Sequence, residues 1–143
     1  MEIAKPSDQV KVLNFLERNY VTSDPLCKSL KLTNKKLDRS LEFLMIELLS
    51  QGMTIVAREK SLENKIIGVS VNHRNCIRHA NRLEELSKAA ETVNCKKLLL
   101  IWSLIIKESS LQDDALGMSF ITEKKDLQGQ GVISELMKAS LFL

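Results

Sequence analysis

The segment of the chain best suited to bind a charged ligand is residues 120–132. Phe120-Ile121-Thr122 predicts the end of a strand, residues 124–131 predict a polar, glycine-bearing loop, and a last helix is predicted over 134–143. Such a junction presents free backbone N–H groups at the positive end of a helix, which suits a phosphate or pyrophosphate. Gly129 and Gly131 matter because a side chain there would hold the phosphate away from these donors.

Two well-known phosphate-binding patterns do not fit this loop. The dinucleotide pattern G-x-G-x-x-G is absent because Gly129 and Gly131 are followed by Ser134, and no Gly-Lys-Ser/Thr of a Walker loop occurs. On these residues alone, a strand–helix connection with glycines for a tight turn remains an equal alternative.

The same loop resembles the cofactor loop of GNAT-type N-acetyltransferases. Gln128-x-x-Gly131 matches most of their signature Gln/Arg-x-x-Gly-x-Gly/Ala, with Ile133 at the last position, and Ser134-Glu135-Leu136-Met137 continues as the family's helix does. The resemblance implies acetyl-CoA as cosubstrate. It implies that backbone amides of the loop cradle the CoA pyrophosphate and that the preceding strand lines the pantetheine arm through its backbone. The residues concerned are Gln128, Gly129, Gln130, Gly131 and Val132 for the pyrophosphate, and Ile121, Thr122 and Glu123 for the arm.

A second resemblance lies near the N-terminus. Tyr20-Val21-Thr22-Ser23-Asp24-Pro25-Leu26 is similar to the segment of animal arylalkylamine (dopamine-like) N-acetyltransferases whose acidic residue before Pro-Leu is the general base. An amine is protonated at neutral pH and must lose a proton before it attacks a thioester. The resemblance implies that Asp24, where the family usually has glutamate, is this base. The alternative is that Asp24 forms a turn before Pro25.

The N-terminal half predicts a short strand and three helical segments. A strand over 2–4 precedes a helix that begins at Pro6-Ser7-Asp8, where Ser7 or Asp8 accepts a backbone bond. Its apolar stripe is Val10, Leu13, Leu16 and Tyr20. A helical turn over 26–30 follows Pro25. Thr33 or Asn34 caps a longer helix with the stripe Leu37, Leu41, Leu44 and Leu48, and Gly52 ends it.

The second half predicts strands over 53–57 and 65–71, joined through 59–64. Helical spacing returns with Leu83, Leu86, Ala90 and Val93, and the apolar run 98–106, which includes Trp102 as a core residue, is assigned to a helix on its length. A strand over 115–122 leads into the loop, and Leu136, Met137 and Ser140 share one side of the last helix. The order is that of a mixed α/β domain.

This layout matches the GNAT resemblance over nearly the whole chain. The resemblance implies a mainly antiparallel sheet flanked by helices, in one N-acetyltransferase domain over 1–143. In the family, further strands and a helix follow the signature helix, one strand opening the cleft that holds CoA. We therefore expect an incomplete domain that lacks the C-terminal strands, a truncated product or isoform with weak or absent catalysis.

Composition sets outer limits on the function. The net charge of +3, the 44% apolar share and the 27% charged share are those of an ordinary folded domain. The three scattered cysteines, Cys27, Cys76 and Cys95, fit a reducing compartment, and the longest apolar run is about half of a membrane span. We expect a cytoplasmic protein without membrane contact.

Two further constellations point to no ligand. His73-x-x-Cys76-x-x-His79 lacks a fourth zinc ligand nearby, so no metal is expected. Arg74, Arg78 and Arg82 would share one face of a helix, but with an aromatic share of 4% they indicate a solvated surface and no nucleic-acid partner.

The sequence thus predicts an N-acetyltransferase that moves acetyl from acetyl-CoA to a primary amine by direct attack. The resemblance implies an arylalkylamine, and polyamines remain open. The competing interpretation is a truncated or degenerate relative that acts by binding only, and a third is a small α/β binding module unrelated to CoA. The oligomeric state is not indicated.

Overall fold

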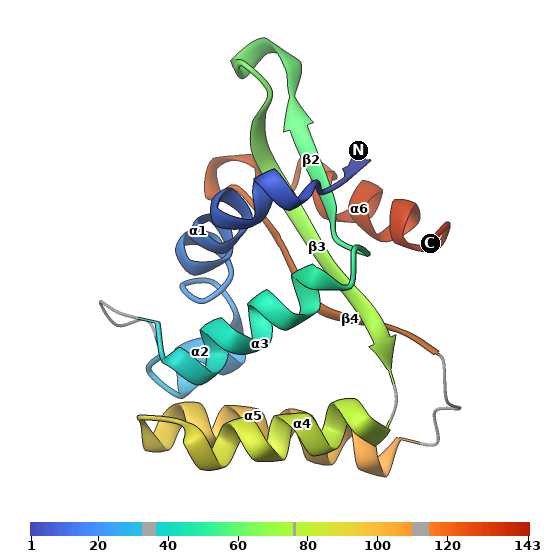
Figure 1. The fold of residues 1–143 in the computed structure, drawn as a ribbon. Helices are drawn as coiled ribbons and strands as arrows, with labels where there is room; N and C mark the ends of the chain where they lie inside the picture. Colours follow the sequence, from blue (N-terminus) through green and yellow to red (C-terminus); the bar gives the residue numbers. More distant parts are fainter. Residues whose placement is uncertain (33–36, 76, 110–114) are drawn as a thin grey trace. The chain divides into compact units, whose positions relative to one another are not determined.

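The computed structural model describes residues 1–32, 37–75, 77–109 and 115–143 (Figure 1). The chain divides into two compact units. The first comprises Met1–Tyr20, Ile46–His73 and Met118–Leu143, and the second comprises Val21–Met45 and Arg74–Gly117. The expectation of one domain over 1–143 stays a prediction.

The described residues form a four-stranded sheet in the order β1-β2-β3-β4. The strands are β1 (Glu2–Ile3), β2 (Ile55–Glu59), β3 (Lys65–Asn75) and β4 (Ala115–Glu123). The pairs β1/β2 and β2/β3 are antiparallel, and the second pair shifts register between Ala57 and Arg58. The hairpin between β2 and β3 turns through a 3₁₀ segment, Lys60–Leu62. The mixed, mainly antiparallel fold expected from the sequence is confirmed.

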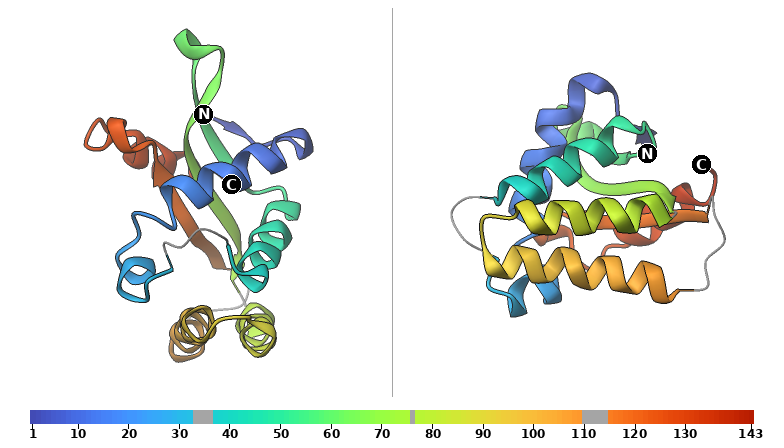
Figure 2. Two further views of the ribbon diagram at one scale, coloured as in Figure 1. Left: turned by 90° about the vertical axis from the view of Figure 1, so that its left-hand side faces the viewer. Right: turned by 60° about the horizontal axis from the view of Figure 1, so that its bottom comes forward.

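In the first unit, helices α1 (Gln9–Asn19) and α6 (Val132–Ser140) lie on opposite faces of the sheet (Figures 1 and 2). α1 buries Val12 and Leu16, and the Tyr20 ring meets the Phe120 ring of β4 edge to face at a centroid distance of 5.0 Å. The predicted stripe was wrong at Val10, which is 68% exposed. A 3₁₀ turn at Pro6–Asp8 sets the phase of α1, so that positions 12, 16 and 20 face the core.

The second unit is helical. It contains α2 (Pro25–Ser29), the first part of α3 (Arg39–Ser50), α4 (Ile77–Ala89) and α5 (Val93–Glu108). α4 and α5 lie side by side and antiparallel (Figure 2), with the Ser103 hydroxyl donating to the Ala80 carbonyl at 2.9 Å. None of the described helices combines the length and apolar character needed to cross a bilayer.

The helix boundaries correct several predictions in this part of the chain. α3 buries Leu41, Leu44 and Leu48 as predicted, but Leu37 precedes it, and the proposed caps Thr33 and Asn34 lie outside the described residues. The prediction that Leu83, Leu86, Ala90 and Val93 share one helix stripe was wrong. A new helix, α5, begins at Val93 after its N-cap Thr92, and Val93 is 67% exposed. Arg74 belongs to β3 and so shares no helix face with Arg78 and Arg82. Trp102, predicted as core, is half-buried.

Cys27 and Cys95 are buried, free thiols of the second unit. Burial raises the pKa of each to about 12, with the nearby carboxylate of Asp24 adding to the effect at Cys27 and that of Asp38 at Cys95. Such thiols carry little thiolate and behave as small apolar core residues. Cys76 lies outside the described residues.

Asp8 holds the start of α1 against the sheet. The Asp8 side chain does not cap α1, contrary to the prediction that Ser7 or Asp8 would do so. Its carboxylate instead accepts the preceding Lys5 N–H at 2.9 Å and pairs with the Arg58 guanidinium of β2 at 2.7 Å. Asp8 is buried. The Lys5 N–H and the Arg58 guanidinium together hold the pKa of Asp8 below its usual value of 3.8.

This depressed pKa makes stability depend on pH in the acid range. Asp8 contributes stability above the pKa of the unfolded chain, and this contribution is lost as the pH falls through the lower, folded pKa. Urea unfolding of Asp8→Asn and the unchanged chain should show the largest difference above pH of about 5, shrinking below about 4. A difference that stays constant across this range would contradict the assignment.

Candidate functional site

The loop after β4 has a tightly defined backbone. A 3₁₀ turn, Lys125–Leu127, is closed by the Leu127 N–H donating to the Lys124 carbonyl at 2.9 Å, and the Gln130 N–H donates to the Leu127 carbonyl at 3.1 Å. Gly129 and Gly131 follow with φ of +81° and +85°. Side chains rarely adopt this left-handed conformation, so both glycines are needed for the shape of the loop.

Gly131 is the N-cap of α6, and the predicted cradle residues meet at this helix end. The first bond into the helix runs from the Glu135 N–H to the Gly131 carbonyl at 3.1 Å. The N–H groups of Val132, Ile133 and Ser134 precede it and have no acceptor within the helix. A β-carbon at Gly129 or Gly131 would meet no atom within 4 Å, so the space beside these donors is open. The arrangement suits an anion.

The end of β4 offers backbone groups at the edge of the sheet. The Lys124 N–H donates to the Ile67 carbonyl of β3 at 2.8 Å. Backbone groups of successive strand residues point to opposite sides, so those of Ile121 and Glu123 point away from β3 while those of Thr122 point toward it. Among the described strands, β4 is at one end of the sheet order. Of the three residues predicted to line a ligand arm, Ile121 and Glu123 are therefore the ones expected to turn their main-chain groups away from β3.

Gly68 of β3 allows α6 to pack directly onto the sheet. A β-carbon at this position would lie 2.7 Å from Val132 Cγ1 and 2.9 Å from Leu136 Cδ1, closer than atoms can approach. Leu136 completes a core with Ile55 and Ala57. Sequence analysis missed Gly68, although a glycine inside a strand is a known signal for close approach of another segment.

A buried polar network fixes the other end of α6. The Ser140 hydroxyl lies 3.2 Å from the Ser70 hydroxyl of β3 and donates to the Leu136 carbonyl at 2.9 Å. Asn72 extends the network, because its Nδ2 donates to the Met53 carbonyl at 3.0 Å. The helix is held at both ends, so the loop that leads into it has a fixed position within the first unit. Met137, predicted to share this face, is 51% exposed.

Lysines neutralise the acidic side chains around the loop. Lys124 pairs with Asp126 at 3.0 Å and Lys138 pairs with Glu135 at 2.7 Å. The hydrogen bond from Lys124 lowers the pKa of Asp126. Lys125 is exposed beside them. These two ion pairs offset the charges of Asp126 and Glu135, whereas the buried Glu123 carboxylate has one oxygen without a hydrogen-bond partner.

Asp24 lies in the second unit as the N-cap of α2. Its Oδ2 accepts the Cys27 N–H at 2.8 Å. This bond is the turn-forming role that the sequence left open as an alternative. Its role as a general base stays a prediction, and Asp24 belongs to another unit than the loop after β4.

Among the described residues, no group of three or more His, Cys, Asp or Glu side chains is arranged to hold a metal ion. Within the motif at 73–79, His73 ends up in β3, His79 in α4, and Cys76 lies outside the described part of the chain. His73 Nδ1 instead lies 3.1 Å from the Ser119 hydroxyl of β4, a pairing that sequence analysis did not foresee.

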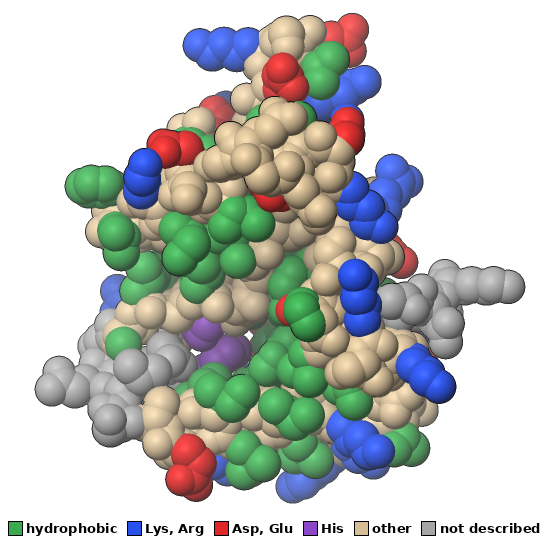
Figure 3. Space-filling model, turned by 180° about the vertical axis from the view of Figure 1, so that it is seen from behind, with side chains coloured by type: hydrophobic (Ala, Val, Ile, Leu, Met, Phe, Trp, Pro, Cys, Tyr) green, Lys and Arg blue, Asp and Glu red, His purple; other side chains and the backbone are tan. Residues whose placement is uncertain are grey.

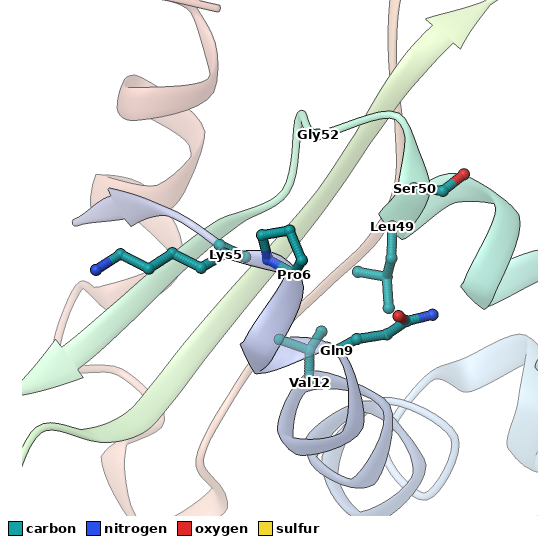
Figure 4. Close-up of a pocket in the computed structure, with 8 residues that line it drawn as sticks. Lys5, Pro6, Gln9, Val12, Leu49, Ser50 and Gly52 are labelled. Carbon is teal, nitrogen blue, oxygen red and sulfur yellow. The ribbon is translucent and has the colours of Figure 1, made fainter.

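A cavity of about 300 Å³ in the first unit lies where the start of α1 meets the end of α3. It is lined by Ala4, Lys5, Pro6, Gln9, Val12, Leu49, Ser50 and Gly52. Figure 4 shows the Lys5 ammonium pointing away from the Gln9 and Leu49 side chains. The cavity contains none of the predicted site residues and brings no charged group toward a ligand, so it is not the candidate site.

Both units also expose apolar side chains. Met137, Leu141 and Phe142 of the first unit are 51%, 80% and 90% exposed, and Leu104 and Ile105 of the second are 55% and 60% exposed. Figure 3 shows hydrophobic side chains gathered on the face turned away from the viewer in Figure 1. These side chains add little to either core.

Comparison with known proteins places the fold. The chain matches no protein-family model and no curated protein sequence. It is similar in structure to a mosquito arylalkylamine N-acetyltransferase-like protein, 5b, with a TM-score of 0.84 and 18% identity, over 99% of this chain and 68% of that one.

Two further solved structures agree. Arylalkylamine N-acetyltransferase 2 from Aedes aegypti gives a TM-score of 0.79 at 19% identity, over 97% of this chain and 67% of that one. The Drosophila melanogaster polyamine N-acetyltransferase, which catalyses the formation of N-acetylagmatine, gives a TM-score of 0.78 at 15% identity. The match covers 99% of this chain and 68% of that one. The chain therefore has the fold of these N-acetyltransferases, as expected from the resemblance.

Proposed function

We propose that this chain binds acetyl-CoA at the loop between β4 and α6 and transfers the acetyl group to a primary amine, of the arylalkylamine class. The observation that carries the proposal is the open N-terminus of α6 behind Gly131, formed by the residues that match the acetyltransferase signature. Structural neighbours named for arylalkylamine and polyamine acetylation support it. Free thiols at Cys27 and Cys95 fit the cytoplasm as its location.

In this proposal the backbone carries cofactor binding. The amides of Gly129, Gly131 and Val132 contact the pyrophosphate, and each hydrogen bond to a charged group contributes about 1.5–3 kcal/mol. Gln128 and Gln130, predicted with them, use their N–H groups inside the loop, where they donate to the Lys125 and Leu127 carbonyls. The outward backbone groups of Ile121 and Glu123 pair with the amides of the pantetheine arm, and Thr122 holds the strand to β3. The arm then runs back along β4 from the pyrophosphate.

The chemical step is direct attack of the neutral amine on the thioester carbonyl. Asp24 is the candidate base, acting through a water because Oδ2 caps α2. The amine nitrogen forms a bond to the carbonyl carbon and loses an N–H proton, the carbon–sulfur bond breaks, and the CoA thiolate takes up a proton.

A chain that binds CoA without catalysis is the second candidate, favoured by the use of Asp24 as a helix cap. An assay of N-acetylated product with an arylalkylamine and a polyamine separates the two. Product above the uncatalysed rate supports the enzyme, and its absence with tight binding supports the binding protein.

Calorimetric titration with acetyl-CoA tests the site itself. Gly131→Glu places a carboxylate and a β-carbon in the pyrophosphate cradle and should abolish detectable binding. Gly52→Glu is the matched control, because Gly52 also has a positive φ, of +71°, and open space around its β-carbon position. It should lose similar stability and keep binding. A folded, unchanged chain that does not bind acetyl-CoA would refute the proposal.

A further inference from the structure

Ser119 and His73 form a hydroxyl–imidazole pair that the proposed site does not yet use. Ser119 Oγ in β4 lies 3.1 Å from His73 Nδ1 in β3. The His73 side chain is only 4% exposed, whereas Ser119 is half-buried. The imidazole is therefore held in the interior with its Nδ1 against the hydroxyl of a partly exposed residue.

The position of Ser119 along β4 places it near the reacting end of the cofactor, an argument that rests on the function proposed above. Ser119 precedes Glu123 by four strand residues, which span roughly 13 Å. The pantetheine arm is a chain of methylene and amide groups of comparable length. With its pyrophosphate at the loop and its arm along β4, the thioester comes to lie beside Ser119.

We propose that Ser119 and His73, in place of Asp24, form the proton relay for the amine substrate. An accessible hydroxyl in contact with a buried imidazole is the arrangement by which a proton is passed between a reacting group and a base. The pair belongs to the same unit as the cofactor loop, whereas Asp24 belongs to the other. It therefore has a defined place relative to the proposed cofactor.

The relay balances the proton through the reaction. With the resting proton of His73 on Nε2, Nδ1 accepts from Ser119 Oγ–H. The ammonium N–H bond of the substrate breaks as a new O–H bond forms at Ser119, and the original hydroxyl proton passes to Nδ1. After the amine attacks and the carbon–sulfur bond breaks, the acylated nitrogen releases its second proton to solvent. The same path runs in reverse and delivers the proton held on His73 to the CoA thiolate.

A single-turnover experiment tests the relay. The chain in excess over acetyl-CoA is mixed with saturating tryptamine, and release of the CoA thiol is followed in time. Ser119→Ala and His73→Gln should each slow the reaction on the order of 100-fold. The double variant should be no slower than the slower single one, because residues that act as one unit are not additive. Ser119→Thr, which keeps the hydroxyl, should retain most of the rate.

Binding measurements separate a relay from a structural role. The Kd for acetyl-CoA should stay within a factor of three in Ser119→Ala, about 0.6 kcal/mol. Ser103→Ala is the matched control, since its buried hydroxyl donates to the Ala80 carbonyl within the second unit, and it should leave the rate unchanged.

Each failure has a distinct meaning. If Ser119→Ala reacts at the rate of the unchanged chain, the relay is wrong and the proposed function stands. Binding of acetyl-CoA without any transfer in the unchanged chain also refutes the relay and leaves a CoA-binding protein. Absence of binding removes both proposals.

Discussion

Replacing Gly68 by valine is expected to lower the free energy of unfolding by about 3 kcal/mol and to weaken acetyl-CoA binding. Overpacking of a well-packed contact typically costs about 1–3 kcal/mol, and here the first new carbon alone would overlap two side chains of α6. The Leu136 methyl group belongs to a flexible side chain, whereas Val132 Cγ1 is stiff and lies at the first residue of the helix. α6 must therefore move outward, and the loop amides at its N-terminus move with it.

Urea unfolding and calorimetry together check this prediction. The informative control is Gly68→Ala alone and combined with Val132→Ala, which removes the atom at 2.7 Å. If the contact is the cause, Gly68→Ala should cost at most half as much stability in the Val132→Ala background as it does in the unchanged chain. Additive losses would show that Gly68 is needed for another reason.

The backbone conformation of the loop after β4 was predictable because it is determined by residues close together in the sequence. Gly129 and Gly131 adopt positive φ, and Gly131 caps the helix that follows, so the conformation depends on neighbouring residues only. The same holds for Asp24, which caps α2 because its carboxylate accepts the N–H of Cys27, three residues ahead. Helix periodicity was also sufficient for α3, where Leu41, Leu44 and Leu48 face the core.

Contacts across the sheet were not predictable, because they depend on strand register. His73 and Ser119 are 46 residues apart, and a shift of one position in either strand would place their side chains on different faces. Gly68 is close to Val132 only in the observed position of α6. The wrong assignment of Val10 to the buried face of α1 has a similar origin. Val10 fits the helical spacing, but the 3₁₀ turn at Pro6–Asp8 precedes the helix and Val10 faces solvent.

The second large effect is expected at Asp38, which joins the start of α3 to the turn between α4 and α5. One carboxylate oxygen accepts the Ser40 N–H at 2.9 Å. The other accepts the N–H groups of Glu91 and Thr92, at 3.1 and 3.0 Å, and the Thr92 hydroxyl at 3.2 Å. Asp38→Ala removes every one of these acceptors and should lower the free energy of unfolding by about 2–4 kcal/mol, because donors that lose their partners while partly buried remain poorly hydrated.

Matched variants distinguish this cause from a loss of surface charge. Asp38→Asn retains one carbonyl oxygen but turns an NH₂ group toward backbone donors, so urea unfolding should show a loss no smaller than half of that in Asp38→Ala. Arg39→Ala removes the neighbouring, exposed ion pair with Glu91 between the same two segments and should change stability by less than about 1 kcal/mol. An equal loss in Arg39→Ala and Asp38→Ala would mean that charge attraction, rather than the accepted hydrogen bonds, holds the α4–α5 turn against α3. The geometry argues for the hydrogen bonds, since Asp38 is 9% exposed and its acceptors are aligned with the free N–H groups that precede α5.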